Sequence, residues 1–217
     1  MPQIYLAFHG ALAVLRQQSS RWTAELTMVD QDYQCLAVDP HRPQRVYCGT
    51  FAAGLAMSDD AGLTWQPVAG KLPYAAIMSV TVSPLEEVGG VGVVWAGTEP
   101  SALFRSEDSG RTWQERPGLQ DLPSKPTWSF PPRPWTHHVR WIEPDATIAE
   151  RLFVGIELGG VMRSLDGGQI WEDRQPGSQY DCHTLRTHPQ AGARCHLRSG
   201  RGRFCREPRR WHHLARP

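Results

Sequence analysis

Short apolar runs, each ending in a proline, recur along the chain and give it a regular rhythm. They cover residues 35–40, 79–84, 139–144 and 184–189, and their prolines are 44, 60 and 45 residues apart. Apolar runs of this length, bounded by proline and glycine, are typical of β-strands. The pattern therefore predicts a strand at the start of each of four units.

Two further strands follow the first one in each of three units. The second strands are predicted at 46–50, 93–98 and 152–156, and the third strands at 55–58, 103–106 and 161–164. A glycine-containing turn separates the second strand from the third, and a fourth strand begins at a tryptophan. Four-stranded repeats of about 45 residues are typical of propeller blades.

The pattern S-x-D-x-G-x-T-W occupies the turn between the third and fourth strands of all three units. Its fixed positions are Ser58, Asp60, Gly62 and Trp65, then Ser106, Asp108, Gly110 and Trp113, then Ser164, Asp166, Gly168 and Trp171, with isoleucine replacing the threonine in the third copy. Serine and aspartate oxygens accept hydrogen bonds from turn amides, glycine tolerates positive φ, and tryptophan buries a large apolar face. We therefore interpret these residues as structural.

These three octads resemble the Asp-box, or BNR, repeat of sialidases, sortilin-type receptors, certain glycoside hydrolases and photosystem II assembly factors. Over residues 30–190 the chain is most similar to bacterial BNR-repeat proteins labelled glycosyl hydrolase. The resemblance implies an all-β fold, a β-propeller of four-stranded antiparallel blades. With about four to five blades' worth of strands, we expect the propeller to be incomplete. Because enzymes and non-enzymes share the box, the resemblance implies no activity.

A shortened unit precedes the first complete one. Apolar runs at 4–8, 12–15 and 22–28 keep the strand rhythm, but the turn at 16–21 has lost the aspartate and the glycine of the box. We interpret this unit as a degenerate blade. The sequence thus predicts a partial propeller over residues 1–190.

Residues 191–217 form a second segment with a different composition. From residue 182 to the last residue the chain has nine arginines, no lysine and a single acidic residue, Glu207, and the strand rhythm stops after residue 189. Three interpretations remain open: a basic arm for nucleic acid, which we consider unlikely, a zinc site, or a segment translated out of frame from about Gln190. We favour the third. The zinc reading would use Cys195, His196, Cys205, His212 and His213.

Composition limits the remaining classes. The chain has 217 residues, 40% of them hydrophobic, and no apolar run long enough to cross a membrane. The start of the chain lacks the basic and apolar parts of a signal peptide, so we expect a cytoplasmic protein. Five cysteines without a C-x-x-C spacing do not indicate a disulfide framework, and we expect neither a cofactor nor a metal.

The candidate site follows from strand topology. Connections alternate between the two ends of a blade, so the octads and prolines share one face, and the ligand of sialidases binds on the opposite face. Loops predicted there carry flat aromatic rings for stacking and histidines with carboxylates for proton transfer or metal binding. The candidate catalytic residues are Glu157 and Asp181, and the candidate ligand-binding residues are Trp135, His137, His138, Arg140, Tyr180 and His183.

Two functions compete for this face. A binding module would hold a carbohydrate or a protein partner without catalysis. A glycoside hydrolase would use Glu157 and Asp181 as its paired carboxylates. The arginine triad and the Arg-Ile-Pro start of sialidases are not recognisable, so we favour binding. A purely structural alternative is that His137 and His138 bond loop backbone and that Glu157 caps a turn.

Overall fold

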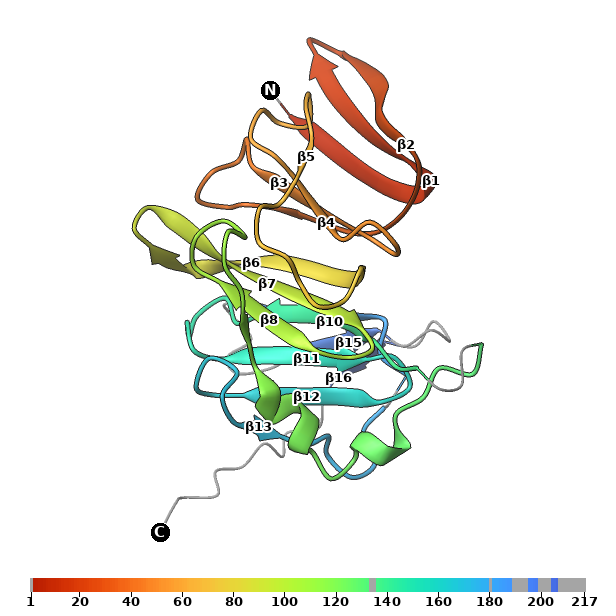
Figure 1. Cartoon of the computed structure of the whole chain (residues 1–217), viewed down its shortest axis with the longest axis vertical. Coiled ribbons are helices and arrows are strands. Elements are labelled where there is room, and N and C mark those ends of the chain that lie inside the picture. Colours follow the sequence, from red (N-terminus) through yellow and green to blue (C-terminus); the bar gives the residue numbers. More distant parts are fainter. Residues whose placement is uncertain (1, 133–135, 180, 189–194, 199–203, 207–217) are drawn as a thin grey trace.

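The chain is almost entirely β-structure (Figure 1). The computed structural model describes residues 2–132, 136–179, 181–188, 195–198 and 204–206. Its elements are β1 (Gln3–Gln18), β2 (Arg21–Val38), β3 (Val46–Thr50), β4 (Leu55–Ser58), β5 (Gln66–Pro67), β6 (Ala76–Val88), β7 (Val91–Glu99), β8 (Leu103–Ser106), β9 (Gln114–Glu115), η1 (Pro117–Asp121), η2 (Lys125–Thr127), β10 (Val139–Pro144), β11 (Leu152–Ile156), β12 (Gly160–Ser164), β13 (Trp171–Glu172), β14 (Thr184–Thr187), β15 (Cys195–Arg198) and β16 (Phe204–Arg206). No helix in the described part of the chain is long and apolar enough to span a membrane.

Three antiparallel sheets match the three predicted units. Their strand orders are β1-β2-β3-β4-β5, in which β1 belongs to the shortened first unit, β6-β7-β8-β9 and β10-β11-β12-β13. The predicted bounds of β3, β4, β8, β10 and β11 are confirmed to the residue. The largest departure from the predicted bounds is in β6, which does not end at Pro84 but continues, with a change of register, to Val88, where Gly89 and Gly90 at positive φ turn the chain into β7.

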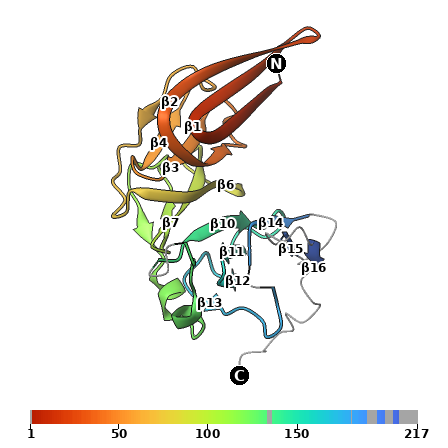
Figure 2. The ribbon, with the colours of Figure 1, turned by 90° about the vertical axis from the view of Figure 1, so that its right-hand side faces the viewer.

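The degenerate first blade shares a strand with its neighbour. β1 is bent at Gly10, which has φ 84°, so that its first half lies along its second half. A hydrogen bond from the amide of Gln17 to the carbonyl of Pro2 (3.1 Å) joins the two halves. The first part of β2 pairs with β1, and the last part pairs with β3 in the next sheet. The expected three strands of this blade are therefore present, joined without a break to the blade that follows (Figure 2).

The first strands of successive blades lie innermost and side by side. β6 contacts β2 and β10, and β10 contacts β14. Together with the start of β1 they line a cavity of about 540 Å³, whose wall includes Leu6, Ala37, Val80, Ile142 and Arg186. The sheets thus follow one another around this cavity in an open arc (Figure 2). This is the radial arrangement of a β-propeller.

The three octads form the same turn three times. In each, the glycine amide donates to the serine hydroxyl (2.8 Å) and that hydroxyl donates to the aspartate (2.8 Å). The fourth and fifth residues have positive φ every time, as Ala61 and Gly62 do at 60° and 80°. Hydrogen bonds from the side chain and backbone of Thr64 lower the pKa of Asp60 to about 2.

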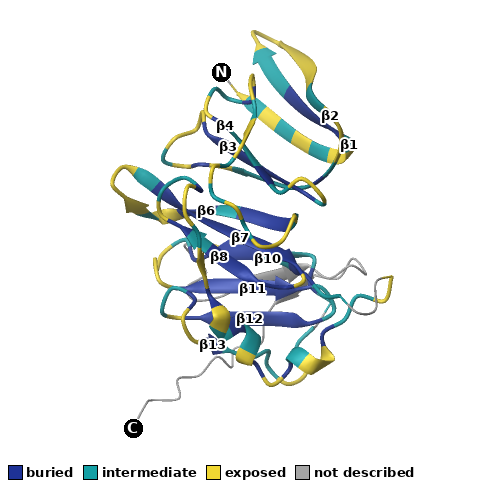
Figure 3. Cartoon of the chain, viewed as in Figure 1, coloured by how far each residue is buried: buried dark blue, intermediate teal, exposed yellow. Residues whose placement is uncertain are grey.

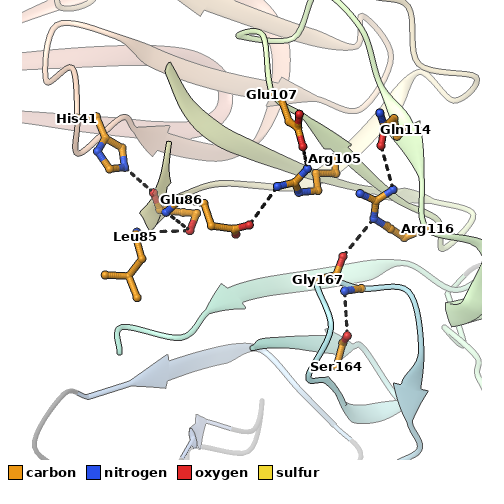
Figure 4. Close-up of polar contacts among 11 residues, drawn as sticks. His41, Leu85, Glu86, Arg105, Glu107, Gln114, Arg116, Ser164 and Gly167 are labelled. Atoms are coloured by element: carbon orange, nitrogen blue, oxygen red, sulfur yellow. Dashed lines mark hydrogen bonds and ion pairs between the residues drawn. The ribbon is translucent and has the colours of Figure 1, made fainter. Parts of the chain in front are cut away.

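Each octad also docks on the preceding blade. The guanidinium of Arg16 donates to the carbonyl of Ala61 (3.0 Å), Arg45 bonds Ser109, and Arg116 donates to the carbonyl of Gly167 (3.1 Å; Figure 4). These three acceptors occupy the same fourth position of the octad. The octad tryptophans pack there too, with Trp171 in one core cluster with Trp95. The octads therefore join blades as well as strands.

A glycine in each second strand lets the next blade approach closely. A Cβ on Gly49 would lie 2.8 Å from Ile77 Cγ2, and one on Gly97 would lie 2.4 Å from Val139 Cγ1. Burial accordingly peaks in the second and third strands, where β3, β11 and β12 have no exposed residue (Figure 3). The core thus lies between the blades.

The segment 191–217 contains two described strands. β15 pairs with β14, and β16 pairs with β15, in a three-stranded antiparallel sheet. The boundary at residue 190 and the out-of-frame interpretation stay predictions. Cys35, Cys48 and Cys182 are free thiols among the described residues, and burial raises the pKa of Cys35 to about 12.

Candidate ligand site

The candidate site lies at the end of the third complete blade that is far from its octad. β11 begins at Leu152, which pairs with the octad residue Ser164, and ends at Ile156, which pairs with Gly160. Glu157 therefore follows β11 at the opposite end of the blade. His138 reaches the same end, because it directly precedes Val139, the partner of Ile156.

Glu157 is the centre of this site. Its Oε2 lies 2.9 Å from Nε2 of His138 and 3.7 Å from Nε of Arg140, and its Oε1 lies 3.5 Å from Nε2 of His183. Burial alone would raise the pKa of Glu157. The hydrogen bond with His138 and the electrostatic influence of His138, His183 and Arg140 outweigh burial, so the pKa of Glu157 falls below its usual range.

Acidic side chains and imidazoles alternate across three blades at this end. Nδ1 of His138 lies 3.4 Å from Oε2 of Glu99, and its Nε2 faces Glu157. On the other side of Glu157, Nε2 of His183 lies 3.2 Å from Oδ1 of Asp181. The side chain of His138 is only 2% exposed, whereas that of His183 is 36% exposed. The row Glu99, His138, Glu157, His183, Asp181 thus runs from the interior to the surface.

Glu99 is the member of this row that the sequence analysis missed. It ends β7 at the position that Glu157 occupies after β11, and His183 precedes β14 as His138 precedes β10. Aligning the second strands of the two blades would have paired the two glutamates. The two glutamates and the two histidines of the row thus hold equivalent positions in successive blades.

The other predicted residues have different surroundings. Arg140 and Asp181 lie in the cluster with Glu157 and His183. The ring of His137 instead meets the ring of Trp128 edge-on at 5.3 Å, and burial, Lys125 and His138 lower its pKa. Trp135 and Tyr180 lie outside the described residues.

The long loop before β10 is packed against the blade. Leu119, Leu122 and Trp128 belong to the core cluster of that blade. Asp173 accepts hydrogen bonds from the amide (2.8 Å) and the hydroxyl (2.5 Å) of Ser124, and Trp128 Nε1 donates to the same hydroxyl (2.9 Å). The ring of Phe130 meets that of His138 edge-on at 5.0 Å. These aromatic rings hold the histidines in place.

The chemistry of the cluster follows from this geometry. Nε2 of His183 contacts both candidate carboxylates, Glu157 at 3.5 Å and Asp181 at 3.2 Å. A general acid needs a raised pKa, whereas that of Glu157 is lowered. The arrangement suits acceptance of hydroxyl or cationic groups.

Solved structures with the same fold include GH74 enzymes and the extracellular domain of a two-component system. The chain resembles the GH74 enzyme of Niastella koreensis (TM-score 0.62, 16% identity), the GH74 xyloglucanase of Xanthomonas campestris (0.52, 17%) and the extracellular domain of a putative hybrid two-component system of B. thetaiotaomicron (0.60, 11%). The alignments cover 90%, 91% and 94% of this chain, and 31%, 42% and 28% of those chains. No protein-family model and no curated protein matches the sequence.

The likeness to these structures, together with the radial sheets, makes the chain a β-propeller protein. It spans less than half the length of the three structures it resembles. At these identities the comparison shows the fold alone.

Proposed function

We propose that this β-propeller binds a carbohydrate through the side chains of Glu157, Asp181, His183 and Arg140, without catalysis. The observation that carries the proposal is the convergence of these four side chains, from two neighbouring blades, at the end away from the octads. Carboxylates accept hydrogen bonds from sugar hydroxyls, and guanidinium and imidazole groups donate them. The site therefore places hydrogen-bond acceptors and donors for sugar hydroxyls close together.

Two features favour binding over hydrolysis. The lowered pKa of Glu157 keeps it ionised, so it is unsuited to protonating a leaving group. His138 and Arg140 also hold it on one side, which fits a fixed acceptor. Glycoside hydrolysis by Glu157 and Asp181 remains the second candidate, because the two carboxylates lie close together at the proposed site.

The test is a glycan array probed with the full chain, followed by titration calorimetry with each glycan that binds. We expect Glu157→Gln to weaken binding by about tenfold or more, since a charged acceptor is replaced by a neutral one. Glu150→Gln is the matched control, because Glu150 is exposed near the octad end of the same blade. Binding that is equal in both variants would refute the proposal.

The same protein is assayed for hydrolysis of chromogenic glycosides. Turnover that Glu157→Gln abolishes and Glu150→Gln preserves would establish the hydrolase instead. A glycan array without a hit, combined with capture of a peptide that depends on Glu157, would identify a protein partner rather than a carbohydrate.

A further inference from the structure

Three donor atoms surround one point at the outer end of the row. One donor atom from each of Glu157, Asp181 and His183 lies within 4.8 Å of the other two. The three residues are half-buried. Two adjacent blades supply the set, since Glu157 follows β11 and the other two precede β14.

The ring nitrogen of His183 that faces both carboxylates cannot donate a full hydrogen bond to each. Nε2 of His183 lies 3.2 Å from Asp181 Oδ1 and 3.5 Å from Glu157 Oε1. This nitrogen carries at most one hydrogen, so it donates fully to one carboxylate at a time. Two carboxylates this close also repel each other. A divalent cation at the central point would accept a lone pair from each residue and neutralise both acids.

The spacing of the donors fits a single small ion. Ligands bound to Zn²⁺ at about 2.1 Å in tetrahedral geometry lie about 3.4 Å from one another. The two contacts of His183 Nε2, at 3.2 and 3.5 Å, bracket that value. The donor oxygens of Glu157 and Asp181 lie within 4.8 Å of each other and would have to approach to about 3.4 Å for both to bind the ion.

Glu157 is oriented for this role by the buried part of the row. His138 contacts Oε2 of Glu157 at 2.9 Å, and Glu99 lies on the far side of the same imidazole. Oε1 of Glu157 is therefore the oxygen that faces His183. Metal-binding carboxylates are commonly fixed in this way by a group behind them.

We propose that Glu157, Asp181 and His183 bind a divalent transition-metal ion. One imidazole and two carboxylates suit Zn²⁺ or Mn²⁺ better than Ca²⁺ or Mg²⁺, which prefer oxygen ligands alone. Three protein ligands leave at least one coordination position for water or for a ligand oxygen. The three proposed ligands are also three of the four residues proposed to bind a carbohydrate, so the metal is titrated in the absence of glycan and this test stands whether or not a sugar binds.

Mn²⁺ is the probe, and the full chain is titrated with it while electron paramagnetic resonance measures the free ion. Mn²⁺ binds poorly to thiolates, so the cysteines of the chain contribute little to the signal. We expect one equivalent to bind, and Zn²⁺ to displace it. Asp181→Asn and His183→Gln should each weaken binding by about tenfold or more, since each removes one of three ligands.

His9→Gln is the matched control. His9 and Asp32 form a similar pair at 3.2 Å, but no third donor from the described residues joins them, and the side chain of His9 is 90% exposed. This variant should bind Mn²⁺ as the unaltered chain does. No stoichiometric binding, or binding unaffected by both Asp181→Asn and His183→Gln, would overturn the proposal. Circular dichroism confirms that the variants keep their β-structure.

Discussion

Nε2 of the buried His138 lies 2.9 Å from Oε2 of Glu157, across the first two strands of one blade. Since Nδ1 of His138 faces Glu99 at 3.4 Å, one imidazole separates two acidic side chains from neighbouring blades. The contact between His138 and Glu157 therefore connects the candidate site to the buried part of the blade. His138 therefore contributes both to the candidate site and to the stability of the fold.

Removing this imidazole should destabilise the protein. In His138→Ala, Glu157 loses a hydrogen bond and Glu99 loses its 3.4 Å contact with the imidazole in a buried setting. Losing a buried hydrogen bond to a charged group costs about 1–3 kcal/mol, so we expect the free energy of unfolding to fall by that amount. Urea denaturation at neutral pH measures the change.

His9→Ala is the comparison, because His9 is exposed and its ion pair with Asp32 should contribute under about 1 kcal/mol. Equal stability losses in the two variants would show that the contacts of His138 do not stabilise the fold.

The pH dependence of stability should reveal the first octad. The pKa of Asp60 is about 2 in the folded chain against an ordinary 3.8, so its ionised form stabilises the fold above about pH 4. That contribution is lost as the pH falls towards 2. Asp60→Asn should therefore be less stable at pH 7 and lose less stability than the unaltered chain between pH 4 and 2.

Melting temperatures at a series of pH values measure this difference. Asp121→Asn serves as the control, since Asp121 is exposed and lies outside the octads. A curve for Asp60→Asn that runs parallel to that of the unaltered chain below pH 4 would contradict the prediction.

Repetition explains which parts of the structure were predictable. β10 and β11 follow directly from apolar runs bounded by proline and turn residues, and the octads confine the site to the opposite end of the blade. The continuation of β6 past Pro84 has no counterpart in the other units, so the repeat could not indicate it. The burial of His138 depends on Phe130, which lies in a loop without a repeat partner.

The approach of β14 to the preceding blade depends on Gly155. A Cβ at Gly155 would lie 2.2 Å from Sγ of Cys182, which stands between Asp181 and His183. Gly155→Ala should force this segment outward and cost about 1–3 kcal/mol, the usual penalty of overpacking. It should also weaken any binding that depends on Asp181 and His183, because both move with Cys182.

Cys182→Ala supplies the internal test, because it removes the sulfur that clashes. The next contact of the added Cβ is then the Cβ of residue 182 at 3.3 Å, which a small adjustment relieves. The double variant should therefore be more stable than the sum of the two single effects predicts, by about 1 kcal/mol in a double-mutant cycle of urea unfolding. Strictly additive effects would mean that Gly155 and Cys182 do not touch, and the docking of β14 would need another explanation.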